Sequence, residues 1–215
     1  MKLPNSWKEV PLKHYIEISE VSFIDMDEID KAVKILAILS SQSEEDIIEL
    51  TVDEIARYTK QVSFVFKKYE PKGVPTFIRL KGKRYSLNND VKSLSGAEYI
   101  DFTSLIKDKQ DIAKNLPQIL AIFLEPINIF GFKKKDCYRK NPEGNYIKKL
   151  QVRVDVAKDC LELPSTTAMD LAGFFLKSYE SLTKATLNYL KLKQMKTMKI
   201  LRKEAMALEN IGRGS

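Results

Sequence analysis

The chain has 215 residues, of which 44% are hydrophobic and 30% charged, a composition that supports a folded core and excludes a disordered chain. Its net charge is +7, and its longest apolar run of about six residues is far below the roughly 20 that cross a bilayer, so we expect no membrane segment. Met1–Trp7 lacks the apolar segment of a secretory signal, and two cysteines are typical of a reducing compartment without a structural disulfide.

Residues 1–70 are expected to form a first helical unit, because apolar side chains recur there at helical spacing. Each of the predicted helices begins at a residue typical of a helix start. Thr51 and Glu54, for example, form a capping box, in which the hydroxyl accepts the N–H of Glu54 while the carboxylate accepts the N–H of Thr51. The predicted starts are Pro11, Asp27, Ser43 with Asp46, and Thr51 with Glu54.

Residues 71–90 are predicted to form a linker and a small β-hairpin. The segments 76–80 and 84–87 have the composition of strands, and they flank Lys81-Gly82-Lys83, which supplies a glycine for the turn. A two-stranded hairpin is marginally stable alone, so we expect it to lie against helices or to pair with the edge of another chain.

Residues 91–183 are expected to form a second unit that repeats the first. The segment Lys34–Leu39 (KILAIL) recurs 84 residues later as Gln118–Phe123 (QILAIF), and Tyr15-Ile16 recurs at the same offset. This pattern indicates a degenerate duplication of a helical unit. The alternative is chance similarity between two amphipathic helices.

The second unit also departs from the first. Ser95 and Glu98 form a capping box, and the next helix spans about residues 111–124, where Pro117 should kink it or mark its true start. A basic insertion then occupies about residues 127–150, and a short helix is predicted to begin at residues 154–157. Beyond the insertion the offset grows to 113 residues.

From residue 165 to about residue 208 only Gly173 interrupts the helical pattern, which predicts a long C-terminal helix. Residues 184–215 carry an apolar stripe among basic residues, and we interpret them as a basic helical arm that binds a partner in preference to a membrane surface. The predicted partner-binding residues of the arm are Lys191, Met195, Met198, Lys199, Leu201, Arg202, Lys203 and Leu208, and those of the insertion are Lys133, Lys134, Lys135, Arg139 and Lys140.

The charges are distributed in blocks of opposite sign. Residues 17–54 contain twelve acidic and two basic residues, whereas residues 131–153 and 184–215 each contain eight basic and two acidic ones. Such blocks favour oriented contact between copies or neighbours, with ordinary solvated surfaces as the alternative. Because Phe132, Tyr138 and Tyr146 lie among the basic residues of the insertion, nucleic-acid binding through phosphate contacts and base stacking is a further hypothesis.

No catalytic or metal site is indicated by the sequence. The single histidine, His14, lies on a predicted amphipathic helix without a nucleophile motif, and Cys137 and Cys160 have no second histidine to complete a metal site. Neither a Gly-x-Gly-x-x-Gly motif nor a P-loop occurs. We therefore predict a protein that is not an enzyme and needs no cofactor.

Several segments carry a resemblance to a known group of proteins. Leu3–Val10 (LPNSWKEV), Tyr15–Ile18 (YIEI), Lys34–Leu39 and Leu94–Phe102 (LSGAEYIDF) resemble small proteins encoded among the structural genes of tailed phages of Bacteroides-type hosts, including crAss-like phages. The likeness covers roughly residues 3–190. The resemblance implies a virion or assembly protein, and it assigns no catalytic residue to this sequence.

Two roles follow from the resemblance: a ring or head-to-tail connector component near the portal, or a protein similar to tail assembly chaperones. It implies portal or neighbouring ring and tail proteins as partners, a homo-oligomer, and assembly into the virion in the host cytoplasm. The basic insertion and the arm extend beyond a compact helical pattern and favour a component of a large assembly. A nucleic-acid-binding packaging or cargo protein is the remaining alternative.

Overall fold

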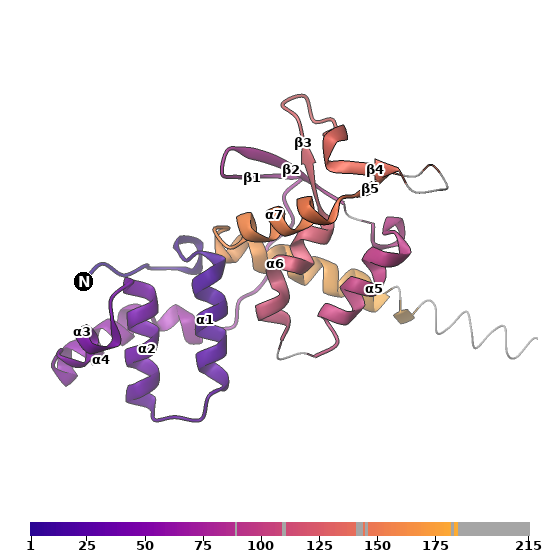
Figure 1. Ribbon diagram of the computed structural model, residues 1–215. Helices are drawn as coiled ribbons and strands as arrows, with labels where there is room; N and C mark the ends of the chain where they lie inside the picture. Colours follow the sequence, from indigo (N-terminus) through magenta and orange to yellow (C-terminus); the bar gives the residue numbers. More distant parts are fainter. Residues whose placement is uncertain (89, 109–110, 141–143, 145, 182, 185–215) are drawn as a thin grey trace, which may run out of the picture. The chain divides into compact units, whose positions relative to one another are not determined.

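The protein is mainly α-helical with a small antiparallel hairpin in the middle of the chain, as predicted (Figure 1). The computed structural model describes residues 1–88, 90–108, 111–140, 144, 146–181 and 183–184. Met1–Phe174 forms one compact unit and Phe175–Ser215 a second. The arm predicted for residues 184–215 lies outside the described residues, except for Lys184.

The first repeat contains four α-helices. They are α1 (Leu12–Phe23), α2 (Glu28–Ser40), α3 (Glu44–Ile48) and α4 (Val52–Gln61), accompanied by the short 3-10 helices η1 (Trp7–Glu9) and η2 (Ser63–Phe66). The predicted caps form: Ser43 and Thr51 each accept an N–H through their hydroxyl oxygens, at 3.1 and 3.3 Å. Local capping chemistry therefore positions both short helices.

The core of the first repeat is organised around Trp7. Its ring meets the rings of Tyr15 and Phe64 edge-on, with centroid separations of 5.3 and 5.4 Å. The same cluster contains the buried side chains Ile35 and Leu36 of α2. The lead-in segment before α1 is therefore part of the core.

The second repeat follows the same helix order as the first, as the predicted duplication requires. Helices α5 (Gly96–Leu105) and α6 (Ile112–Phe123) begin 84 residues after α1 and α2 (12 to 96 and 28 to 112). The helix that begins at residue 165 starts 113 residues after α4 (52 to 165), and α7 (Leu150–Cys160) precedes it as α3 precedes α4.

Burial repeats with the helices. Leu36 and Leu120, which are 84 residues apart, are both 0% exposed, and Ile18 and Phe102 are buried at the same offset. Since equivalent positions face equivalent cores, the two repeats share a packing pattern as well as a helix order.

Strands come from three parts of the chain. β1 (Phe77–Leu80) and β2 (Lys83–Leu87) form the predicted hairpin, in which Lys81 and Gly82 have φ values of 47° and 75°, as a tight two-residue turn requires. β3 (Leu124–Ile127) pairs antiparallel with β2 and gives the order β1-β2-β3.

Within the insertion, β4 (Tyr138–Lys140) and β5 (Tyr146–Lys148) form a second hairpin. The 3-10 helices η3 (Val91–Ser93) and η4 (Lys135–Cys137) precede α5 and β4.

Three local predictions are corrected. Pro117 does not mark the start of a helix, because α6 begins at Ile112 and buries the proline ring within it. The helix predicted to reach residue 124 ends at Phe123, because Leu124 is the first residue of β3 and pairs with β2. The helix predicted at residues 154–157 begins earlier, at Leu150, directly after β5.

The start of the chain is bonded to the second repeat. Leu12 donates its N–H to the Leu163 carbonyl at 2.7 Å, and both the N–H and the hydroxyl of Ser165 donate to the Val10 carbonyl, at 2.8 and 2.7 Å. Ser165 is 0% exposed, so these bonds are shielded from water. They join residues about 150 positions apart into one unit.

The equivalent leucines provide a test of the duplicated core. We expect Leu36→Ala and Leu120→Ala each to lower the free energy of unfolding by about 2–5 kcal/mol, because each leaves a cavity in a fully buried site. Ile100→Ala, at a side chain that is 67% exposed, should change it by no more than about 0.5 kcal/mol. Urea denaturation of the three variants measures this. A loss below about 1 kcal/mol at either leucine would contradict the shared core.

Candidate interaction surfaces

A buried lysine holds the insertion against the end of α6. The Lys148 ammonium, on β5, donates to the carbonyls of Ala121, Ile122 and Leu124 at 2.9, 3.0 and 2.7 Å. These carbonyls belong to the last turn of α6 and the first residue of β3, where carbonyl oxygens lack helical partners and favour a positive charge. Lys148 thus acts as the C-terminal cap of α6.

Burial has a measurable consequence for this amine. It lowers the pKa of Lys148 to about 8, and the carboxylates of Glu98 and Glu125 only partly oppose the shift. Lys148 is 8% exposed, so its role is structural and it is not part of the accessible basic surface.

A buried carboxylate joins the β1–β2 hairpin to α7. Asp159 accepts from the Lys83 ammonium at 2.8 Å and from the Tyr85 hydroxyl at 3.1 Å. Burial, and then the adjacent Asp159 carboxylate, raise the pKa of Tyr85, so the phenol remains a donor. The neighbouring Cys160 thiol has its pKa raised to about 12, mainly by burial, which makes it unreactive at neutral pH.

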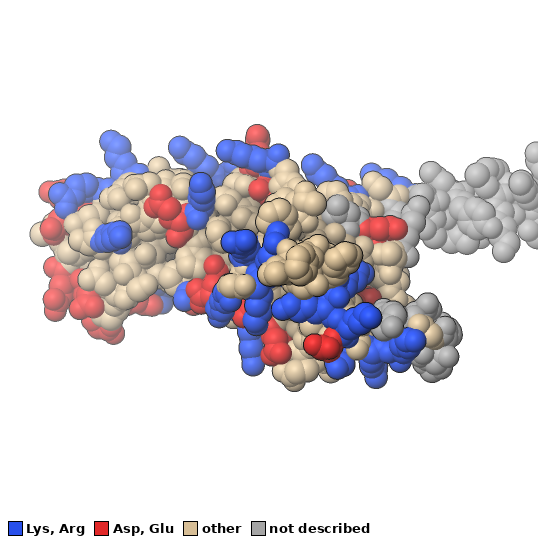
Figure 2. Space-filling view, turned by 90° about the horizontal axis from the view of Figure 1, so that it is seen from above, with Lys and Arg blue, Asp and Glu red and all other residues tan. Residues whose placement is uncertain are grey.

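These two anchors place cations from separate segments on one surface. We define the basic sheet surface as Arg79, Lys81, Lys83, Arg84, Lys133 and Lys134, and Figure 2 shows lysine and arginine side chains gathered over the part of the molecule that carries the strands. Arg79, Lys83, Arg84 and Lys134 line a hollow of about 490 Å³. Arg84 is held there by its contact with the Phe77 ring, 5.0 Å from the centroid, and by a 2.9 Å bond to the Ile129 carbonyl.

An exposed apolar turn borders this surface. Ile129, Phe130 and Phe132 are 73%, 77% and 70% exposed. The Asn128 side-chain oxygen accepts the N–H groups of Phe130 and Phe132 at 3.0 and 2.9 Å, so the turn has a defined backbone. Large apolar side chains beside cations are typical of a binding surface.

The structure brings together only part of the predicted partner-binding set. Lys133 and Lys134 belong to the basic sheet surface, Lys135 starts η4, and Arg139 and Lys140 are on β4. Lys133 also pairs with Glu125 at 2.6 Å. The arm residues Lys191, Met195, Met198, Lys199, Leu201, Arg202, Lys203 and Leu208 lie outside the described residues.

Sequence reasoning missed Arg79, Lys81, Lys83 and Arg84. The signal was present, because four cations fall within the six residues of the predicted hairpin from 79 to 84. Their proximity to the insertion follows from the pairing of β2 with β3, which the sequence did not indicate.

Two pairs of equivalent positions in the repeats carry opposite charge. Asp30 on α2 and Glu45 on α3 correspond to Lys114 on α6 and Lys158 on α7, at offsets of 84 and 113 (30 to 114 and 45 to 158), and all four are exposed. Figure 2 shows acidic side chains gathered at the end that carries α3 and α4.

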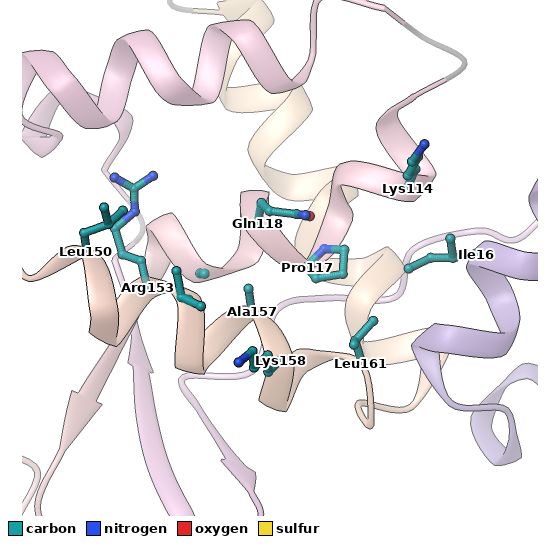
Figure 3. Close-up of a pocket in the computed structure, with 11 residues that line it drawn as sticks. Ile16, Lys114, Pro117, Gln118, Leu150, Arg153, Ala157, Lys158 and Leu161 are labelled. Carbon is teal, nitrogen blue, oxygen red and sulfur yellow. The ribbon is translucent and has the colours of Figure 1, made fainter.

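Lys114 and Lys158 border a groove between α6 and α7 (Figure 3). Its volume is about 460 Å³, and Pro117, Ala157 and Leu161 contribute to its apolar lining. Ile16 of α1 lies near one end, and Leu150 near the other.

A second groove lies between α2 and α4. We call it the α2–α4 groove; it has a volume of about 500 Å³, and it is lined by Ile29, Ala32, Val52, Ile55, Thr59 and Phe66, among others. No residue of α4 is buried. Val52, Ile29 and Phe66 are 73%, 60% and 62% exposed, so the described chain leaves an apolar surface uncovered here.

The described residues contain no group of three or more His, Cys, Asp or Glu side chains placed to hold a metal ion. Cys137 and Cys160 are both free thiols. Within the same ranges, every helix is too short or too polar to cross a membrane. No protein-family model matches the chain, and comparisons with curated proteins and with solved structures give no match.

The pKa of Lys148 provides a test of the α6 cap. Because the folded-state pKa of about 8 lies below the ordinary 10.5, the unfolded chain binds more protons between these values, and this group makes stability rise with pH there. Between about pH 8 and 10, the free energy of unfolding of the wild type should increase by about 2 kcal/mol more than that of Lys148→Met. Denaturation at several pH values measures the difference. Lys149→Met changes an exposed neighbour and should show the same dependence of the free energy of unfolding on pH as the wild type. If the wild type and Lys148→Met show the same pH dependence, the assignment of Lys148 as a buried amine is contradicted.

Proposed function

We propose that the chain is a non-enzymatic virion structural protein of a tailed phage, a ring or head-to-tail connector component that acts through contacts with several neighbours. The observation that supports this most directly is the opposite charge at two pairs of equivalent exposed positions: Asp30 and Glu45 on the first repeat, Lys114 and Lys158 on the second. A surface of one sign and a pseudo-equivalent surface of the other favour head-to-tail contact between copies.

The resemblance to phage structural proteins supplies the biological context for this proposal. The uncovered apolar surfaces of the two grooves add contact area that a charge pair alone lacks. A head-to-tail interface of this kind closes into a ring when the rotation between copies divides a full turn, and otherwise continues as a filament.

The mass of the full chain in solution tests the proposal. We expect light scattering at micromolar concentration to give a mass above the 24.7 kDa of one chain, and the mass to fall as salt is raised from about 0.05 to 0.5 M, because charge contributes to the contact. The same series with portal or neighbouring tail proteins added tests assembly on partners. A chain that stays at 24.7 kDa under all these conditions would instead favour the tail-assembly-chaperone alternative.

A second candidate, nucleic-acid binding in packaging, is favoured by the basic sheet surface and the adjoining aromatic turn. Four cations line one hollow, and Phe130 and Phe132 are exposed beside it. Cations that contact phosphates and aromatic rings that stack on bases are the two components of single-strand binding.

This second candidate makes a distinct prediction. Phe130→Ala with Phe132→Ala should weaken binding of a fluorescent single-stranded oligonucleotide by about tenfold or more, because two stacking surfaces are lost. Lys134→Ser should lower the slope of log affinity against log salt by about one. Phe23→Ala with Phe66→Ala, at phenylalanines that are 64% and 62% exposed elsewhere, is the matched control. If the control loses as much affinity for the oligonucleotide as the Phe130 and Phe132 variant, or if the affinity does not depend on salt, nucleic-acid binding is excluded.

A further inference from the structure

The α2–α4 groove differs from its equivalent in the second repeat by being uncovered. Val52 and Ile55 correspond to Ser165 and Ala168 at the offset of 113 (52 to 165 and 55 to 168). Ser165 and Ala168 are both 0% exposed, whereas Val52 is 73% exposed and Ile55 is only partly buried. One of two related surfaces is therefore covered.

The cover on the second repeat is a segment from a distant part of the chain. The backbone of Val10 accepts both bonds from Ser165, and an isolated β-bridge joins Pro11 to Pro164. The duplicated helices thus form a surface that an added segment can cover. The first repeat presents the same kind of surface without such a segment among the described residues.

The composition of the C-terminal arm matches the groove. Residues 184–215 contain eight basic and two acidic residues, while residues 17–54, which include α2 and end in the first turn of α4, contain twelve acidic and two basic ones. Lys60 is a cation within the groove lining itself, so the complementarity arises from the surrounding acidic residues, which include Glu28 and Asp53.

The arm also matches in periodicity and length. Its sequence repeats apolar residues at mostly three- and four-residue intervals, as a helix bound in a groove requires: Leu187, Leu190, Met195, Met198, Leu201, Ala205 and Leu208. A helix over residues 187–208 would be about 33 Å long, more than enough to cross two packed helices. Methionine side chains adapt well to an irregular apolar groove.

We propose that the α2–α4 groove binds the C-terminal arm of a second copy of this chain as an amphipathic helix. The apolar stripe of the arm lies on Val52, Ile29 and Phe66, and its lysine and arginine side chains face the surrounding carboxylates. Each copy then supplies one arm and one groove, which produces head-to-tail assembly. This inference rests on the proposed function and identifies the surface by which copies join.

Mixing two complementary variants of the full chain tests the proposal. The groove variant is Val52→Lys with Phe66→Lys, which places cations at exposed positions facing a basic arm. The arm variant is Met198→Asp with Leu201→Asp. Each alone should weaken self-association by about 100-fold and give the mass of one chain, because two central apolar contacts are replaced by charges. An equimolar mixture should give the mass of two chains, since one variant retains a working arm and the other a working groove.

Two controls make the outcomes distinct. Phe23→Lys with Ile100→Lys adds the same charge at side chains that are 64% and 67% exposed outside the groove, and it should assemble like wild type. Circular dichroism and thermal unfolding of each variant should match wild type. A groove variant that assembles normally, or a mixture that stays at one chain while wild type assembles, overturns the arm–groove contact and leaves the proposed function intact. A wild-type chain that never associates contradicts the proposed function itself.

Discussion

The capping of α6 by Lys148 is the constraint on which the second repeat depends. Helix α6 passes into β3 without a loop, and the carbonyls of its last turn have no partner within the helix. The buried ammonium of Lys148 donates to two of them and to the first carbonyl of β3, and it loses its own hydration in doing so. Neither partner is stable in this position without the other.

This contact determines where the insertion lies. Because Lys148 is the last residue of β5 and α7 begins two residues later, the cap holds both the second hairpin and the start of α7 at the end of α6. Near the other end of α7, the Asp159 carboxylate accepts hydrogen bonds from Lys83 and Tyr85 of the first hairpin. Two buried polar contacts thus bring the cations of two separate segments onto one surface, and hydrophobic packing alone would not specify that register.

The duplication gives the protein two related halves with different surfaces. Helix order and core positions are shared, whereas charge, covering segments and the insertion differ. Such divergence is what a chain needs in order to contact unlike neighbours at its two ends, because identical surfaces would favour a closed symmetric pair. The proposed arm–groove contact and the basic sheet surface follow from this asymmetry: the first uses the acidic half and the second uses the basic half.

The sequence by itself determined the features that depend on neighbouring residues. Ser43, Thr51 and Ser95 predicted helix starts because a cap involves residues only three positions apart, and Gly82 predicted the first hairpin because its turn requires a positive φ. The repeat of KILAIL as QILAIF predicted the shared core. Tertiary structure alone decided the third strand, the burial of Lys148, and the gathering of Arg79, Lys83 and Arg84 beside Lys134. These features depend on pairs such as Tyr85 with Pro126, which are far apart in sequence, so no local pattern specifies them.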